Sequence, residues 1–281
     1  MRRWTLQDNT LEGSQTLQLN LSGKTAIVTG GSAGIGLACA QALYAEGVSV
    51  LIAARDEDRL AQGLAAIADH APESSASALS VSADVSTAGG VERAVERALS
   101  TWGQVDILIN NAGSAPSGDF YSLGDDAYQG AWELKLLGYI RMVRALAPQM
   151  KARREGRIVN IVGAAAHNPT PSFVAGGTAN AAIINFTKGI SQDLAPYGVR
   201  INAISPGPVN TERARQLARQ EAEAQGISVE EAKARRIASV PLSRMAEADE
   251  IADMALFLVS DRAASITGAE VLIDGGATAS V

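Results

Sequence analysis

Short apolar runs alternate with longer amphipathic segments along most of this 281-residue chain, and this alternation is what most restricts its fold. Several runs are rich in β-branched residues and nearly continuous, as is typical of strands buried on both faces of a parallel sheet. The runs span residues 25–29, 48–54, 78–83, 105–110, 157–162, 199–205 and 269–273. Helical periodicity fills the segments between them, including 34–46, 57–69, 90–101, 126–153 and 179–195.

Strands and helices in alternation form right-handed βαβ units. The sequence therefore predicts a three-layer α/β fold, a Rossmann-type doubly wound parallel sheet of about seven strands with helices on both faces. Its length suits one large domain, which we expect to cover residues 21–281. Residues 1–20 are polar and contain no apolar core of signal-peptide length, so we expect a flexible N-terminal arm there.

Composition excludes several classes of partner. The formal net charge of -6 argues against general binding to nucleic acid or to an anionic membrane. No apolar run approaches the roughly 18 residues needed to span a bilayer. One cysteine, Cys39, lies on the same helical face as Ile35 and Leu43 and is expected to be a buried packing residue. Without a possible internal disulfide, the chain is expected to be cytoplasmic, and two histidines with one cysteine predict no metal site.

One insertion interrupts the alternation of strands and helices. Residues 211–240 contain two short helical patterns rich in Arg, Glu and Ala, after the sequence Ser205-Pro206-Gly207-Pro208. One interpretation is a solvated helical pair stabilised by charges four residues apart. The other is a lid over a substrate site, because the insertion follows the carboxyl end of a strand, where loops carry function.

A glycine-rich turn joins the first strand to the first helix. Residues 29–36 read Thr-Gly-Gly-Ser-Ala-Gly-Ile-Gly. Glycines at this place let the chain turn tightly and let the backbone approach a pyrophosphate closely. The following helix presents free N–H groups and a partial positive charge to the phosphates. The turn therefore predicts a dinucleotide site.

Further strand-end motifs follow in order along the chain. They are Asp84-Val85, Asn110-Asn111-Ala112-Gly113, Pro206-Gly207, Ile266-Thr267-Gly268 and Asp274-Gly275-Gly276. With the glycine-rich turn, they resemble the short-chain dehydrogenase/reductase family over roughly residues 21–276. The resemblance implies hydride transfer to or from a nicotinamide cofactor. It also implies a homodimer or homotetramer, built through the fourth and fifth helices, and a small-molecule substrate.

The resemblance also implies which residues bind the cofactor. Matched to the family's motifs, they are Gly30, Ser32, Ile35, Gly36, Asp84, Val85, Asn111, Ala112, Gly113, Pro206, Gly207, Val209 and Thr211. The second strand ends in Ala54 and Arg55, where an acidic residue would favour NAD. A guanidinium suits a 2′-phosphate, so Arg55 favours NADP(H) over NAD(H), unless Asp56 or Asp58 pairs with it instead.

The family's usual proton relay is missing from the corresponding positions. Members carry an Asn on the fourth helix, a Ser after the fifth strand, and a Tyr followed four residues later by a Lys. The alignment places Lys135, Gly163, Gly176 and Asn180 at these positions. An amide and an ammonium have therefore exchanged places, which predicts that Lys135 and Asn180 form a rebuilt proton-transfer site.

Each candidate has an alternative. Lys135 could instead reach solvent or pair with Glu133 or another acid. His167 is either a further catalytic candidate, a role for which histidine is a common residue type, or an ordinary loop residue. The pair Gly176 and Gly177 either makes room for a larger substrate or marks a site no longer used. The function we expect is NADP(H)-dependent hydride transfer on a carbonyl, alcohol or activated double bond. The alternatives are a non-redox lyase or isomerase and an inactive nucleotide-binding protein.

Overall fold

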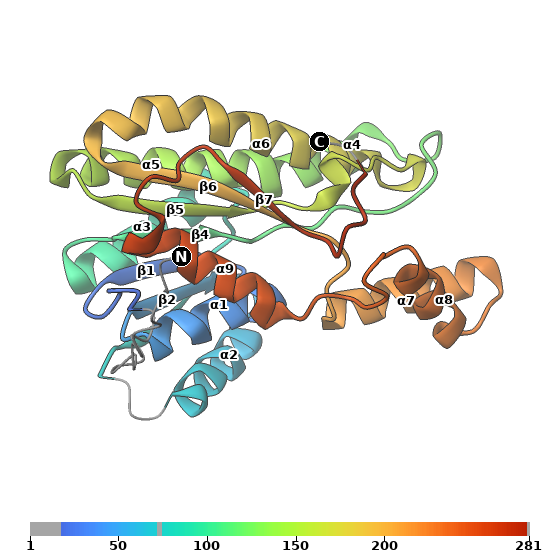
Figure 1. Cartoon of the computed structure of the whole chain (residues 1–281), viewed down its shortest axis with the longest axis horizontal. Coiled ribbons are helices and arrows are strands. Elements are labelled where there is room, and N and C mark those ends of the chain that lie inside the picture. The colour runs from blue at the N-terminus through green and yellow to red at the C-terminus, as the bar shows by residue number, and fades with distance from the viewer. Residues whose placement is uncertain (1–17, 72–74, 280–281) are drawn as a thin grey trace, which may run out of the picture.

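A computed structural model describes residues 18–71 and 75–279 (Figure 1). These residues form one parallel sheet of seven strands in the order β3-β2-β1-β4-β5-β6-β7. The strands are β1 Thr25–Thr29, β2 Ser49–Ala54, β3 Ala78–Ser82, β4 Ile107–Asn110, β5 Gly156–Ile161, β6 Val199–Pro206 and β7 Glu270–Ile273. Every predicted run coincides with one of these strands to within two residues at either end, and the doubly wound α/β fold is confirmed.

The strand order determines where the ligand crevice lies. The chain runs outward from β1 through β2 to β3, then returns to pair β4 with the other side of β1. The connections after β1 and β4 therefore leave on opposite faces of the sheet, which opens a crevice at the carboxyl ends of these two strands. The glycine-rich turn follows β1 and the sequence Asn111-Ala112-Gly113 follows β4, so both border that crevice.

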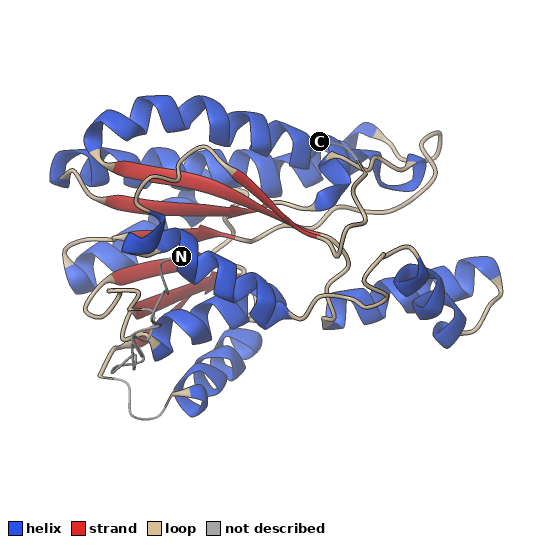
Figure 2. Cartoon of the chain, viewed as in Figure 1, coloured by secondary structure: helices blue, strands red, loops and turns tan. Residues whose placement is uncertain are grey.

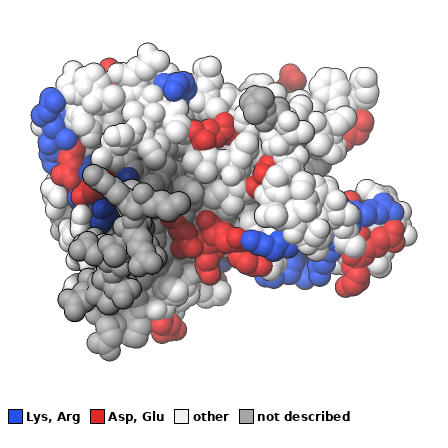
Figure 3. All heavy atoms as spheres, viewed as in Figure 1, with Lys and Arg blue, Asp and Glu red and all other residues white. Residues whose placement is uncertain are grey.

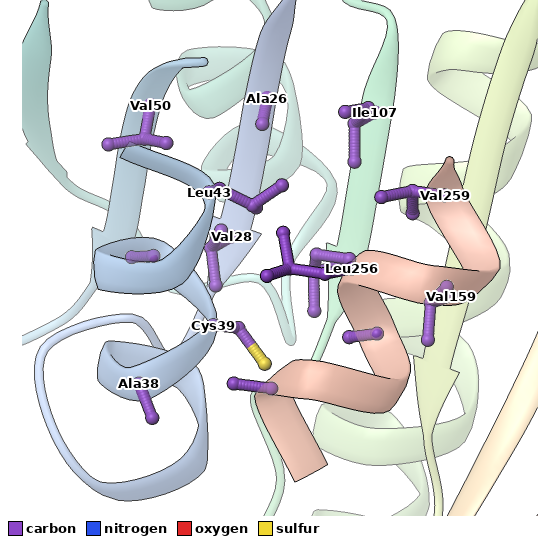
Figure 4. Close-up of a cluster of buried hydrophobic side chains, with 14 of the residues drawn as sticks. Ala26, Val28, Ala38, Cys39, Leu43, Val50, Ile107, Val159, Leu256 and Val259 are labelled. Carbon is purple, nitrogen blue, oxygen red and sulfur yellow. The ribbon is translucent and has the colours of Figure 1, made fainter. Parts of the chain in front are cut away.

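Helices cover both faces of the sheet (Figure 2). On one face lie α1 Gly34–Ala45, α2 Glu57–His70 and α9 Ala248–Val259, and on the other lie α3 Ala88–Trp102, α5 Gly138–Arg153 and α6 Val174–Leu194. Figure 4 shows the first face, where Leu43 and Leu256 pack toward Val28. The expectation for Cys39 is confirmed, since it is 1% exposed in this cluster and burial raises its thiol pKa to about 12.

Two helices differ from their predicted forms. The segment expected as one helix over 126–153 consists of α4 Asp125–Ala131, a π-helical turn Trp132–Leu137, and α5. The helix expected from residue 179 begins at Val174, directly after a 3₁₀ turn. Gly176 and Gly177 therefore lie inside α6 and are buried, because packing outweighs the low helix propensity of glycine.

The insertion is a pair of antiparallel helices beyond the carboxyl ends of the strands (Figure 1). These helices are α7 Glu212–Gln225 and α8 Val229–Ala238, packed on each other through Ala218, Ala222 and Ala232. Acidic and basic side chains alternate over their outer surface (Figure 3). The ion pair between Arg236 and Glu221, at 2.8 Å, joins the two helices.

The predicted N-terminal arm is only partly described. Residues 1–17 lie outside the described residues. The carbonyl of Gln18 accepts a hydrogen bond from Nε of Arg262 at 2.9 Å, and Leu19 packs against the core, so residues 18 and 19 contact the domain. Over 18–71 and 75–279, no helix has both the length and the apolar character required to cross a bilayer.

Candidate active site

The glycine-rich turn packs tightly against the loop that follows β4. Gly30 has a φ of +65°, and a Cβ there would lie 2.9 Å from Nδ2 of Asn111. A Cβ at Gly36, in the first turn of α1, would overlap the carbonyl group of Gly30. Glycine at both positions therefore lets α1 and the two loops pack closely, as a pyrophosphate site requires.

Asn111 joins the two loops through hydrogen bonds. Its side-chain amide donates to the carbonyl oxygens of Thr29 and Gly30 at 3.1 and 3.2 Å. The backbone amides of Asn111 and Ala112 donate to Oγ1 of Thr29 at 2.9 and 3.1 Å. The Asn111 side chain thus holds the crevice walls together.

The first turn of α1 is open to an anionic ligand. Its N-cap residue is Ala33, which provides no side-chain hydrogen bond to the helix. By contrast, Asp56 caps α2 and Thr87 caps α3. The backbone N–H groups at the start of an uncapped helix require another acceptor, and phosphate oxygens meet that requirement.

Arg55 and Asp84 lie at the end where the adenosine half is expected. Arg55 is exposed, and within 18–71 and 75–279 no acidic side chain forms an ion pair with it. Asp56 instead accepts a hydrogen bond from the backbone of Arg59 at 2.9 Å. Burial raises the pKa of Asp84, but hydrogen bonds from Ser86 and the charge of Arg55 outweigh it and lower that pKa. The alternative of an Arg55–Asp56 pair is therefore wrong.

The turn after β6 approaches the glycine-rich turn from the opposite side. Gly207 donates its backbone N–H to the carbonyl of Ile273 at 3.0 Å, which fixes this turn to β7. The Thr211 hydroxyl caps α7 by accepting from the amide of Ala214 at 3.3 Å. The Thr211 methyl lies 3.5 Å from the place of a Cβ on Gly34. The residues predicted for the two halves of the cofactor thus border one crevice.

Lys135 points inward from the π-helical turn. Its Nζ donates to the carbonyl oxygen of Val162 at 2.5 Å, and its methylene groups pack against Gly113, where a Cβ would lie 2.9 Å from Cδ. Burial lowers the pKa of Lys135 to about 8. Glu133 forms its ion pair with Arg141 at 2.7 Å, so the alternative pairing of Lys135 with Glu133 is wrong.

Asn180 reaches the same end of β5 from α6. Its side chain is 3% exposed and lies against Gly163, where a Cβ would be 2.9 Å from Nδ2. Its Oδ1 is buried and has no hydrogen-bond partner among the described residues. Gly163 has a φ of +145°, so a serine there would be strained as well as crowded. Lys135 and Asn180 therefore meet at Val162 and Gly163.

Phe173 occupies the space beside Gly176. A Cβ on Gly176 would overlap the ring of Phe173, which also packs against Ala115 and Ala175. The interpretation that the glycine pair opens room for a larger substrate is therefore wrong at Gly176. Phe173 was not among the predicted site residues, although its place three positions before a glycine is visible in the sequence.

His167 faces away from this cluster and toward β7. Its Nε2 lies 2.8 Å from Oε1 of Glu270, and the same carboxylate oxygen accepts a hydrogen bond from the Ser205 hydroxyl at 2.5 Å. The structure therefore joins His167 to the edge strand and not to Lys135. Within the described part of the chain, His, Cys, Asp and Glu residues form no group of three suited to hold a metal ion.

Known proteins resemble the chain over nearly its whole length. The profile of the family described as enoyl-(acyl carrier protein) reductase matches residues 30–278. The oxidoreductase UcpA of Salmonella typhimurium is 33% identical over 263 residues, covering 92% of this chain and 95% of that protein. L-sorbose reductase from Gluconobacter frateurii, complexed with NADPH and L-sorbose, superposes with a TM-score of 0.89 at 30% identity, covering 94% of this chain and 100% of that one. NAD⁺-bound xylitol dehydrogenase superposes with a TM-score of 0.85 at 29% identity, covering 92% of this chain and 100% of that one.

Proposed function

Because the chain belongs to the short-chain dehydrogenase/reductase family of oxidoreductases, we propose that it transfers hydride between NADP(H) and a carbonyl or alcohol substrate, using a rebuilt proton-transfer site. In this proposal Lys135 supplies the proton to the carbonyl oxygen, and Asn180 orients the bound cofactor. The observation that carries it is the convergence of both side chains on the adjacent residues Val162 and Gly163, directly after β5.

The residues of the crevice fit a nicotinamide dinucleotide. The uncapped first turn of α1 offers N–H groups to the pyrophosphate. The buried, unpartnered Oδ1 of Asn180 requires a donor, which a hydroxyl of the nicotinamide ribose would provide. Arg55, free of ion pairs in the described residues, would bind the 2′-phosphate and favour NADP(H) over NAD(H). When bound, the reduced cofactor supplies a hydride to the carbonyl carbon.

Lys135 is suited to manage the accompanying proton. When hydride adds to a carbonyl carbon, the bonding pair of the C=O group moves to oxygen, which then requires a proton. An ammonium with a pKa near 8 donates that proton more readily than an ordinary lysine does. Lys135 becomes a neutral amine in this step and takes its next proton from water. In the direction of oxidation the neutral amine accepts the proton from the alcohol.

Phe173 supports the assignment of Lys135 as the proton donor, because it leaves no room for another titrating side chain beside Gly176. Its ring occupies the space beside Gly176 and offers no group that titrates. It contributes an apolar wall next to Ala115, and an apolar wall strengthens charge interactions in a site by excluding water.

The test is turnover of carbonyl compounds with NADPH, followed by the loss of nicotinamide absorbance. Lys135→Met should lower turnover by about 10²- to 10⁴-fold, the usual contribution of one general acid. Lys188→Met, which removes an exposed lysine of α6, is the matched control and should leave turnover unchanged. Full activity of Lys135→Met would overturn the proposal. NADPH binding without any turnover would favour a nucleotide-binding protein, and conversion without a change in absorbance would favour a lyase or isomerase.

A further inference from the structure

Arg213 extends from the first turn of α7 to the loop that follows β4. Its Nη2 donates to the carbonyl oxygen of Ala115 at 3.3 Å, so the side chain joins the inserted helices to the loop after β4. Ala115 packs in the same cluster as Phe173 and Ala175, directly beside Gly176. The guanidinium therefore lies next to the cluster that contains Phe173, beside Gly176.

Two cationic side chains thus approach one short stretch of backbone. Lys135 packs against Gly113, and Arg213 binds Ala115, two residues further along. Two residues of extended chain span about 7 Å, a distance comparable to the length of a small bifunctional molecule. Lys135 approaches from the end of β5, and Arg213 approaches from the inserted helices.

The guanidinium of Arg213 is exposed and available to an anionic ligand. A cation in the first turn of a helix is unfavourable next to the positive end of the helix dipole. Over 18–71 and 75–279, no carboxylate forms an ion pair with Arg213. Its neighbours Arg215 and Arg219 both pair with Glu212. A single backbone carbonyl leaves most of the five guanidinium N–H groups of Arg213 available.

We propose that Arg213 binds the carboxylate of an oxo acid whose carbonyl group faces Lys135, and of the corresponding hydroxy acid in the reverse direction. A planar guanidinium matches a carboxylate through two parallel hydrogen bonds. The inference rests on the proposed function, which assigns the carbonyl to Lys135. It adds that the substrate is anionic and that α7 contributes to its recognition.

Binding to the NADP⁺-loaded protein tests this inference apart from turnover, because the oxidised cofactor cannot reduce an oxo acid. Titration calorimetry would compare pyruvate, acetoacetate and phenylglyoxylate with their uncharged ethyl esters. At least one acid should bind more tightly than its ester. Arg213→Met should weaken binding of that acid by roughly 10- to 100-fold and leave binding of the ester unchanged. Arg215→Met, which removes a neighbouring arginine paired with Glu212, is the control and should change neither.

Several outcomes would overturn the inference. They are equal binding of acids and esters, absence of binding by any acid, and an equal loss for acid and ester in Arg213→Met. Weaker NADP⁺ binding in Arg213→Met would assign the guanidinium to the cofactor phosphates instead, and would also overturn it. Selective binding of an acid without turnover by NADPH would support the carboxylate site and contradict the proposed function, so the two failures are distinguishable.

Discussion

The ring of Phe173 occupies the space into which a side chain at Gly176 would extend. Residue 173 precedes α6 and residue 176 lies in its first turn, so the overlap is between neighbours in the chain. The absence of a side chain at position 176 therefore leaves no empty space. The ring of Phe173, which carries no titrating group, fills that space.

This relationship predicts an energetic coupling between the two residues. Gly176→Ala should lower the free energy of unfolding by about 1–3 kcal/mol, because its Cβ overlaps the Phe173 ring. Combined with Phe173→Ala, the loss should be smaller than the sum of the single variants. Chemical unfolding of the four proteins measures the coupling. Gly189→Ala is the control, since a Cβ there meets nothing within 4 Å, and it should stabilise α6 by about 0.5–1 kcal/mol. If the loss of stability in the double variant equalled the sum of the losses in the two single variants, the overlap would be contradicted.

Lys135 predicts a distinct pH dependence of the reaction. If its ammonium is the acid, the rate of carbonyl reduction should fall as pH rises through about 8, and alcohol oxidation should increase over the same range. Initial rates measured in both directions across this range provide the test. Lys188→Met should retain both inflections, whereas residual activity of Lys135→Met should show neither.

The same titration predicts how stability varies with pH. The pKa of Lys135 is lowered from 10.5 to about 8 in the folded protein, so between these values the unfolded chain binds more protons. The free energy of unfolding should therefore gain a positive contribution from this residue as pH rises from 8 toward 10.5. The difference between wild type and Lys135→Met in urea unfolding isolates this contribution. A difference that is constant over the whole range would show that burial does not shift this lysine.

Arg55 should decide between the two nicotinamide cofactors. Arg55→Ala should weaken NADPH binding by roughly 10- to 100-fold, because a charge-assisted contact to the 2′-phosphate is lost, and should leave NADH binding nearly unchanged. Fluorescence titration of each cofactor measures both affinities. Arg59→Ala is the matched control, since Arg59 lies 3.9 Å from Asp56 at the start of α2. Equal losses for NADPH and NADH in Arg55→Ala would argue against a phosphate contact.

Substitution of Asn180 by Leu should weaken cofactor binding without lowering the stability of the cofactor-free protein. Asn180→Leu removes a buried oxygen that has no partner, so the cofactor-free protein should be as stable as wild type or more stable. The same change should weaken NADPH binding, since the ribose loses its acceptor. Thermal unfolding with and without NADPH measures both effects. A variant that binds NADPH as well as wild type would remove Asn180 from the cofactor site.

The fold was predictable because its signals are local. In β1, the residues Thr25–Thr29 are apolar enough to be buried on both faces, and the glycines that follow permit a turn that other residues resist. The same reasoning located the inserted helices and the ends of the strands. The periodicity of apolar residues and the conformational freedom of the backbone depend on neighbouring residues, so both can be read from the sequence without the tertiary structure.

The candidate site was predictable only in part. Alignment to a family pattern selected Lys135 and Asn180 as candidates, but it could not predict the direction of either side chain. The π-helical turn that carries Lys135 interrupts a segment whose pattern predicts one continuous helix. The partner of His167 is Glu270, 103 residues away in sequence, and no periodicity indicates that contact.

By itself, the sequence determined the order of strands and helices, the glycine-rich crevice and the absence of a tyrosine at position 176. Only the tertiary structure decided that Lys135 turns to the end of β5, that Phe173 fills the space beside Gly176 and that Arg213 reaches across to Ala115. The physical reason is that secondary structure follows from local backbone and burial preferences. The partner of a side chain depends on which distant segments packing brings within hydrogen-bond range.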